Sequence, residues 1–207
     1  RPLLVGERTN VIGSRKFKEL ITAGQLEEAS EIARTQVKKG AQIIDICVSN
    51  PERNELEDMV TFLPYVLKKV KAPLMLDSMD AEVVEAVLRL CQGKAIINSI
   101  NLENGLERFE KVAPLVKKYG AAVVVGLIDE QGMALTRQRK LEVAERCYDL
   151  LVKQYGLAPV DLIFDPLTFP VGTGDKKYLG SAVETIEGLR LIKTRFPECK
   201  TILGISN

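Results

Sequence analysis

Short apolar runs recur along this chain, and a polar residue or a glycine follows most of them. The segments between the runs are long enough for one amphipathic helix each, as in residues 25–39, where apolar side chains recur with i, i+3, i+4 spacing. Continuous apolar strands that alternate with helices predict a parallel sheet buried on both faces. The seven predicted strands lie near residues 2–6, 43–46, 74–77, 94–98, 121–127, 162–165 and 201–205.

Six helices are predicted between these strands, and capping residues mark several of their ends. Asp80 can cap a helix over residues 81–91, and Gly120 closes a helix over 103–118. Pro64 predicts an irregularity within its helix. The other helices are predicted over 25–39, 53–71, 137–155 and 178–195, and a polar loop over residues 7–17.

This alternation is typical of a (β/α)8 TIM-type barrel, in which the carboxyl ends of the strands meet at one mouth. Such a barrel has eight strands, whereas seven fit this sequence, so we expect an α/β barrel truncated after strand seven, or an open sheet. The expected domain, residues 1–207, is incomplete because strand eight and the last two helices are absent. The unpaired edges of the first and seventh strands predict that further polypeptide or a partner covers the gap.

Composition removes several classes of function. A net charge of +1 gives no footprint for nucleic acid or an anionic membrane, and no apolar run has the length of a transmembrane helix. The four cysteines lie far apart, which indicates reduced thiols in a cytoplasmic protein and argues against a zinc site. Without histidine, Ser-His-Asp and Cys-His catalysis are excluded, so chemistry must rest on carboxylates, amides, lysine, arginine or a cofactor.

Polar side chains at the predicted strand ends form the main candidate site. The set comprises Glu7, Asp77, Asn98, Asp165 and Asn207. Each could instead cap the following helix. For Asp77, however, Ser78 and Asp80 stand nearer the helix start, and a long irregular stretch follows Asp165. Because barrel strand ends share one mouth, the set favours a ligand site, and its mixture of acceptors and amides suits a neutral heterocycle with N–H and C=O groups.

Other ligands fit less well. A phosphate site at Gly172-Thr173-Gly174 lacks the Walker spacing, and a glycosidase pair would have few aromatic rings on which to stack a sugar, since tryptophan is absent. The polar segment 7–17 is longer than an ordinary connection between a strand and a helix, which indicates a functional loop.

The chain opens with the segment Gly6-Glu7-Arg8-Thr9-Asn10-Val11-Ile12-Gly13-Ser14-Arg15-Lys16-Phe17. This segment resembles the opening of the pterin-binding domain of cobalamin-dependent methionine synthase. The later motifs are also similar to those of methyltetrahydrofolate:corrinoid/iron–sulfur protein methyltransferases. They read Gly40-Ala41-Gln42-Ile43-Ile44-Asp45, Leu76-Asp77-Ser78, Ile97-Asn98-Ser99, Lys118-Tyr119-Gly120-Ala121-Ala122-Val123-Val124, Ile163-Phe164-Asp165-Pro166 and Gly204-Ile205-Ser206-Asn207.

The resemblance implies a methyltransferase domain that binds 5-methyltetrahydrofolate and donates its N5-methyl group to cob(I)alamin on a corrinoid domain or protein, as in methionine synthesis. It implies that the pterin ring is held by Asp77, Asn98 and Asp165, that Asn207 lies beside N5 as the catalytic amide, and that Glu7 is a further pterin contact. Gly13, Ser14 and Arg15 match a folate-contacting segment. No metal site is implied, and a homodimer is left open.

Two alternatives remain at this point. A dihydropteroate synthase shares the barrel and the pterin carboxylates, but its first-loop pattern Asn-x-Thr-x-Asp-Ser-Phe is not seen here. A pterin-binding barrel without turnover is the other. Chemically, a carboxylate can accept from the 2-amino and N3–H groups of a pterin, and an amide such as Asn207 can pair with N5 before and after it gains a proton.

Overall fold

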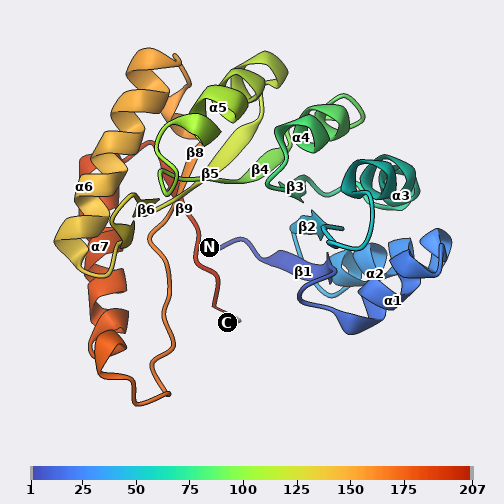
Figure 1. Cartoon of the computed structure of the whole chain (residues 1–207), viewed down its shortest axis with the longest axis horizontal. Helices are drawn as coiled ribbons and strands as arrows, with labels where there is room; N and C mark the ends of the chain where they lie inside the picture. The colour runs from blue at the N-terminus through green and yellow to red at the C-terminus, as the bar shows by residue number, and fades with distance from the viewer. Residues whose placement is uncertain (1, 206–207) are drawn as a thin grey trace. The chain divides into compact units, whose positions relative to one another are not determined.

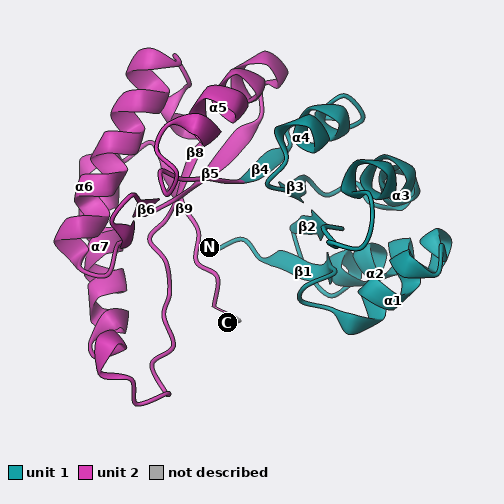
Figure 2. Cartoon of the chain, viewed as in Figure 1, with its two compact units in different colours: residues 1–98 teal, residues 99–207 magenta. Residues whose placement is uncertain are grey.

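The computed structural model describes residues 2–205, and Asn207 lies outside the described residues (Figure 1). The chain divides into two compact units, residues 1–98 and residues 99–207 (Figure 2). Each unit is α/β, with parallel strands that neighbour one another in chain order. Within the described residues, no helix is both long enough and apolar enough to cross a lipid bilayer.

The first unit is a row of parallel strands joined by helices. Its strands are β1 (Val5–Asn10), β2 (Ile43–Cys47), β3 (Leu74–Asp77) and β4 (Ile96–Ile100), of which the last runs into the second unit. Its helices are α1 (Arg15–Thr22), α2 (Leu26–Lys38), α3 (Glu55–Lys69) and α4 (Ala81–Leu88). Ile44, Ile46 and Leu76 are buried in the strands, as expected of a sheet covered on both faces. Phe17 of α1 and Phe62 of α3 meet edge to face, with ring centroids 5.3 Å apart.

The second unit contains parallel strands β5 (Ala122–Gly126), β8 (Leu162–Asp165) and β9 (Lys200–Thr201), and a small hairpin of β6 (Ile128–Asp129) and β7 (Gly132–Met133). Its helices are α5 (Glu107–Tyr119), α6 (Arg137–Tyr148), the π-helical η1 (Asp149–Gln154), the short 3-10 turns η2 (Pro159–Asp161) and η3 (Lys176–Tyr178), and α7 (Ser181–Arg195). Helices α6 and α7 pack side by side, and the chain between β8 and α7 makes a long excursion (Figure 1).

Several sequence predictions are confirmed. The strand positions near 43–46, 74–77, 121–127 and 162–165 agree with β2, β3, β5 and β8. The side chain of Asp80 caps α4 by accepting from the backbone N–H of Glu82 at 2.8 Å. Gly120 ends α5 in the left-handed region, with φ of 62°, which glycine adopts without steric cost. The four cysteines are free thiols.

The polar loop predicted over residues 7–17 is wrong. Strand β1 continues to Asn10, with a register shift against β2 between Gly6 and Thr9, and α1 follows from Arg15. The strand continues because Thr9 is buried and its hydroxyl donates to the carbonyl of Asp45 on β2. A polar residue therefore fills an inward position, which an apolar pattern does not reveal.

Other features also differ from the predictions. Strand β4 runs to Ile100, whereas the prediction ended it at residue 98, so Asn98 lies within the strand and not at its end. Helix α3 continues through Pro64 because burial of Phe62, Leu63 and Val66 holds it on both sides of the proline. The helix predicted over 137–155 changes from α to π geometry after Tyr148. The strand predicted over 201–205 is limited to the two residues of β9, since only these extend the pairing with β8.

Replacing Asp80 by alanine should lower the free energy of unfolding by about 0.5–2 kcal/mol, because α4 loses the acceptor for the N–H of Glu82. Urea unfolding followed by circular dichroism measures this change. Asp80→Asn is the matched control, since asparagine caps helices about as well as aspartate. Equal destabilisation by both substitutions would contradict the capping role.

Candidate functional site

Polar side chains gather at the carboxyl ends of neighbouring strands in the first unit and within two residues of those ends. Asp77 ends β3 and stands opposite Asn98 of β4 in the parallel register. Asn10 ends β1 and stands opposite Cys47 at the end of β2. Because side chains alternate along a strand, Asp45 lies on the same face of β2 as Cys47, two residues earlier. The strands therefore bring carboxylates and amides together on one face.

Hydrogen bonds join four of these side chains into what we call the carboxylate–amide cluster: Asn10, Asp45, Asp77 and Asn98. The Nδ2 atom of Asn10 donates to Oδ2 of Asp45 at 3.2 Å and to Oδ2 of Asp77 at 3.1 Å. Nδ2 of Asn98 reaches Oδ1 of Asp45 at 3.4 Å. One amide thus bridges carboxylates from two adjacent strands.

The surroundings of this cluster favour the protonated, neutral form of its carboxyl groups. Asp45 is 2% exposed, and burial raises its pKa to about 7, with repulsion from Asp77 adding to the effect. Burial also raises the pKa of Asp77, and the charge of Glu55 adds to this, whereas the hydrogen bond from Asn10 opposes it. The Oε1 atom of Glu55 is itself buried without a hydrogen-bond partner among the described residues. The cluster is therefore rich in acceptors.

Asp45 and Asn10 were missed as site residues by the sequence analysis. A carboxylate that interrupts the apolar run of residues 43–46 was a usable signal for Asp45, because a charged side chain within a buried strand needs a partner. Asn10 gave no such signal, since the segment that contains it was predicted as a loop. Its place at the end of β1 comes from the register with β2.

Of the residues predicted to contact folate in the first segment, Gly13 is tied to the cluster through Asn10. The Oδ1 atom of Asn10 accepts from the backbone N–H groups of Ile12, at 2.9 Å, and Gly13, at 3.3 Å. Ser14 follows and caps α1 by accepting from the backbone N–H of Phe17 at 3.3 Å, which gives it a structural role. Arg15 is exposed and pairs with Glu19 at 2.8 Å.

Glu7 is not one of the four residues that define the carboxylate–amide cluster. It lies within β1, not beyond a strand end, and its side chain is exposed. Its charge still contributes, because it is among the groups that raise the pKa of Asp45 and of Asp77.

Asp165 belongs to the second unit and ends β8, opposite Gly126 of β5. Its Oδ1 atom accepts from the backbone N–H of Leu167 at 2.9 Å. Burial raises its pKa, whereas the Leu167 hydrogen bond and the ammonium of Lys140 oppose that shift. Leu167 has φ of 63°, a left-handed conformation that is costly for leucine and typical of functional loops. The sequence analysis missed Lys140, which looked like an ordinary surface lysine on an amphipathic helix.

A family model described as pterin binding enzyme matches residues 6–207 of the chain. Three solved dihydropteroate synthases resemble it in structure. The Yersinia pestis enzyme with a pterine–sulfa conjugate has 20% identity and a TM-score of 0.64, and the Xanthomonas albilineans enzyme with 7,8-dihydropteroate has 19% and 0.66. Both matches cover 100% of this chain and 72% of the other. The Thermus thermophilus enzyme with 6HMPPP has 24% identity and a TM-score of 0.60 over 87% of this chain and 67% of its own. At these identities the likeness concerns the fold.

Raising the pH from 3.8 to about 7 should lower the free energy of unfolding through Asp45. Over this range the folded protein keeps the Asp45 proton while the unfolded chain releases it, so stability falls as pH rises. Since one pKa unit corresponds to about 1.4 kcal/mol, this contribution is at most about 4 kcal/mol.

Urea unfolding at about pH 4 and about pH 8 measures this dependence in the wild type and in Asp45→Asn. The variant should lose less stability between the two conditions. An equal loss in both proteins would show that Asp45 titrates normally.

Proposed function

The chain belongs to the pterin-binding enzyme family, and from this premise we propose that the carboxylate–amide cluster binds the ring of a pterin. The observation that carries the proposal is the amide of Asn10, which donates to Asp45 and Asp77 at once. A site that accepts two N–H bonds from its own asparagine has the geometry to accept N–H groups from a ligand.

The chemistry of the pterin edge supports this proposal. Its 2-amino and N3–H groups are adjacent donors, which a carboxylate accepts with two oxygens. Asn98 supplies both a donor and an acceptor, so it can serve a ring nitrogen and a neighbouring N–H together. The Oε1 atom of Glu55, which is buried without a hydrogen-bond partner within residues 2–205, also favours a ligand with many donors.

The remaining predicted site residues enter the proposal through the resemblance to the methionine synthase domain. Asp165 is proposed as a pterin contact, Gly13 and Arg15 as folate contacts, and Glu7 as a peripheral pterin contact. Ser14 is proposed to act mainly by capping α1, which holds the segment in shape. Asn207, which lies outside the described residues, keeps its proposed place beside N5.

Asp77→Asn should weaken pterin binding roughly tenfold to a hundredfold, because a donor replaces an acceptor and a buried mismatch costs about 1–3 kcal/mol. Titration calorimetry with tetrahydrofolate and with 7,8-dihydropteroate measures the affinity. Asp80→Asn is the matched control, since it makes the same substitution three residues away at an exposed helix cap. Equal affinities of the two variants would remove Asp77 from the site.

Two reactions are compatible with pterin binding. In the first, 5-methyltetrahydrofolate loses its methyl group to cob(I)alamin carried on another domain or protein. The electron pair of the N5–methyl bond stays on N5, which takes a proton, and the product is tetrahydrofolate. The residues of the segment from Gly6 to Phe17 favour this reaction, because they resemble methionine synthase and lack the dihydropteroate synthase pattern.

In the second, the domain takes part in making dihydropteroate. The structural comparisons favour this reaction, because each of the three solved structures described above is a dihydropteroate synthase and two carry pterin-derived ligands by name. The fold and the ring-binding carboxylates are compatible with either reaction.

Parallel assays of the chain distinguish methyl transfer from dihydropteroate synthesis. Methyl transfer is followed by the loss of cob(I)alamin absorbance with 5-methyltetrahydrofolate, and dihydropteroate synthesis by mass spectrometry of the product formed from its activated pterin and aminobenzoate halves. If methyl transfer is the activity, Asn207→Ala should slow the single-turnover step more than it weakens tetrahydrofolate binding, because the amide acts as N5 gains its proton. Turnover in neither assay, with pterin binding intact, would favour a binding module.

A further inference from the structure

Lys140 is a fully buried lysine in the first turn of α6, with 0% of its surface exposed. Its Nζ atom donates to the carbonyl of Ala134 at 2.8 Å and to the carbonyl of Pro166. It also lies over the ring of Phe169, 5.0 Å from the centroid. Burial lowers the pKa of Lys140 to about 8, while the charges of Asp165 and Glu184 oppose that shift, so the side chain is mainly an ammonium at neutral pH.

The two carbonyls belong to segments that follow neighbouring strands. Ala134 lies after the β6–β7 hairpin, which follows β5, and its N–H donates to the carbonyl of Leu127 at 3.0 Å. Pro166 follows β8 directly, and β8 pairs with β5. One ammonium therefore joins the loops at the carboxyl ends of two adjacent strands.

Space for this lysine is made by a glycine on the neighbouring helix. A Cβ atom at Gly188 of α7 would lie 2.7 Å from Cδ of Lys140, closer than side-chain contacts allow. The absence of a side chain at Gly188 therefore leaves room for the buried Lys140 side chain.

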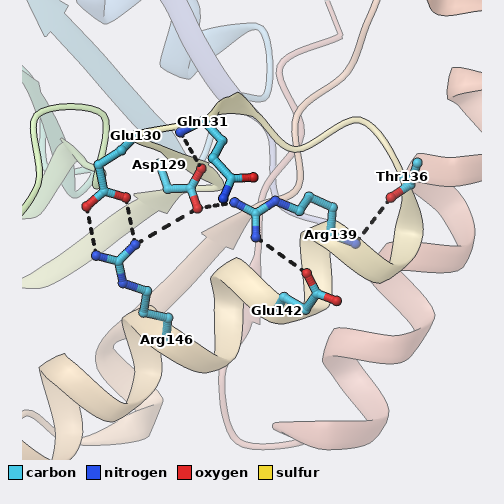
Figure 3. Close-up of polar contacts among 7 residues, drawn as sticks. All are labelled: Asp129, Glu130, Gln131, Thr136, Arg139, Glu142 and Arg146. Carbon is cyan, nitrogen blue, oxygen red and sulfur yellow. Dashed lines mark hydrogen bonds and ion pairs between the residues drawn. The ribbon is translucent and has the colours of Figure 1, made fainter.

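The first turn of α6 carries three cations, Arg137, Arg139 and Lys140, and no acid. This is unfavourable next to the positive end of the helix dipole, so each charge needs a partner elsewhere. Arg137 pairs with Glu184 of α7 at 2.6 Å. Figure 3 shows the second pair, in which Arg139 contacts the buried Asp129 of the hairpin. The third cation, Lys140, has the carbonyls of Ala134 and Pro166 as its partners, and Pro166 lies in the loop after β8.

That loop carries Asp165. Its carboxylate accepts from the N–H of Leu167, and the carbonyl of Leu167 accepts from the hydroxyl of Thr185 at 2.8 Å. The left-handed conformation of Leu167 persists only if the surrounding contacts hold it. Lys140 holds the preceding residue, Pro166, and lies against the ring of Phe169 two residues beyond Leu167.

We propose that Lys140 is a positioning residue that holds the segment 166–169 so that the Asp165 carboxylate stays oriented for its ligand. The inference rests on the proposed function, in which Asp165 contacts the pterin. Lys140 itself acts through the loop.

A double-mutant cycle tests this role, because a residue that acts through Asp165 loses its effect when Asp165 is changed. Affinity for tetrahydrofolate and for 7,8-dihydropteroate is measured by calorimetry for the wild type, Lys140→Met, Asp165→Asn and the double variant. Lys140→Met should weaken binding about tenfold in the wild-type background and less than about twofold in the Asp165→Asn background. Lys153→Met is the control, since Lys153 is exposed and pairs with Asp149.

Equal weakening by Lys140→Met in both backgrounds would show a general structural effect and overturn the inference. Normal binding by Lys140→Met would overturn it as well, with the proposed function intact. A wild type that binds neither pterin would overturn the proposed function and this inference together. If Lys140→Met does not fold, Gly188→Ala takes its place in the cycle, because the added methyl group displaces the lysine and should give a smaller effect with the same dependence on Asp165.

Discussion

Asp45 and Asp77 share one hydrogen-bond donor, Asn10, and neighbouring strands hold the buried Asp45 and the half-buried Asp77 on one face of the first unit. Two ionised carboxylates at such a position would repel each other in a poorly solvated environment. Asn10 reduces this repulsion because its amide group donates to both carboxylates. The raised pKa of Asp45 reduces it further, because Asp45 then stays protonated to a higher pH. Because β1 continues to Asn10, it brings this amide to both carboxylates.

The same asparagine connects the two carboxylates to the segment that follows β1. While its nitrogen serves the carboxylates, its oxygen accepts from Ile12 and Gly13, just before the helix cap at Ser14. A ligand that replaces the amide at the carboxylates would therefore also act on this loop. This arrangement accounts for a first segment that is dense in polar residues and glycines although much of it is regular structure.

In the proposed function, recognition of the ring and choice of reaction depend on different parts of the chain. Carboxylates and amides on parallel strands are placed by the backbone register, so enzymes of one fold can keep them while their chemistry changes. Loops that follow the strands determine what approaches the bound ring. In the second unit such a loop is held by a buried ammonium, which gives the segment after Asp165 a defined shape without regular secondary structure.

The sequence by itself determined the α/β class, the positions of most strands, the caps at Asp80 and Gly120, and the strand-end places of Asp77 and Asp165. These depend on local patterns, namely periodicity and the conformational preferences of single residues. Only the tertiary structure decided the roles of Asn10, Asp45 and Lys140. The partners of Asn10 lie 35 and 67 residues away along the chain, and Pro166 lies 26 residues from Lys140. Whether a polar side chain is buried and paired depends on strand register and helix packing between such distant segments, and no local pattern carries that information.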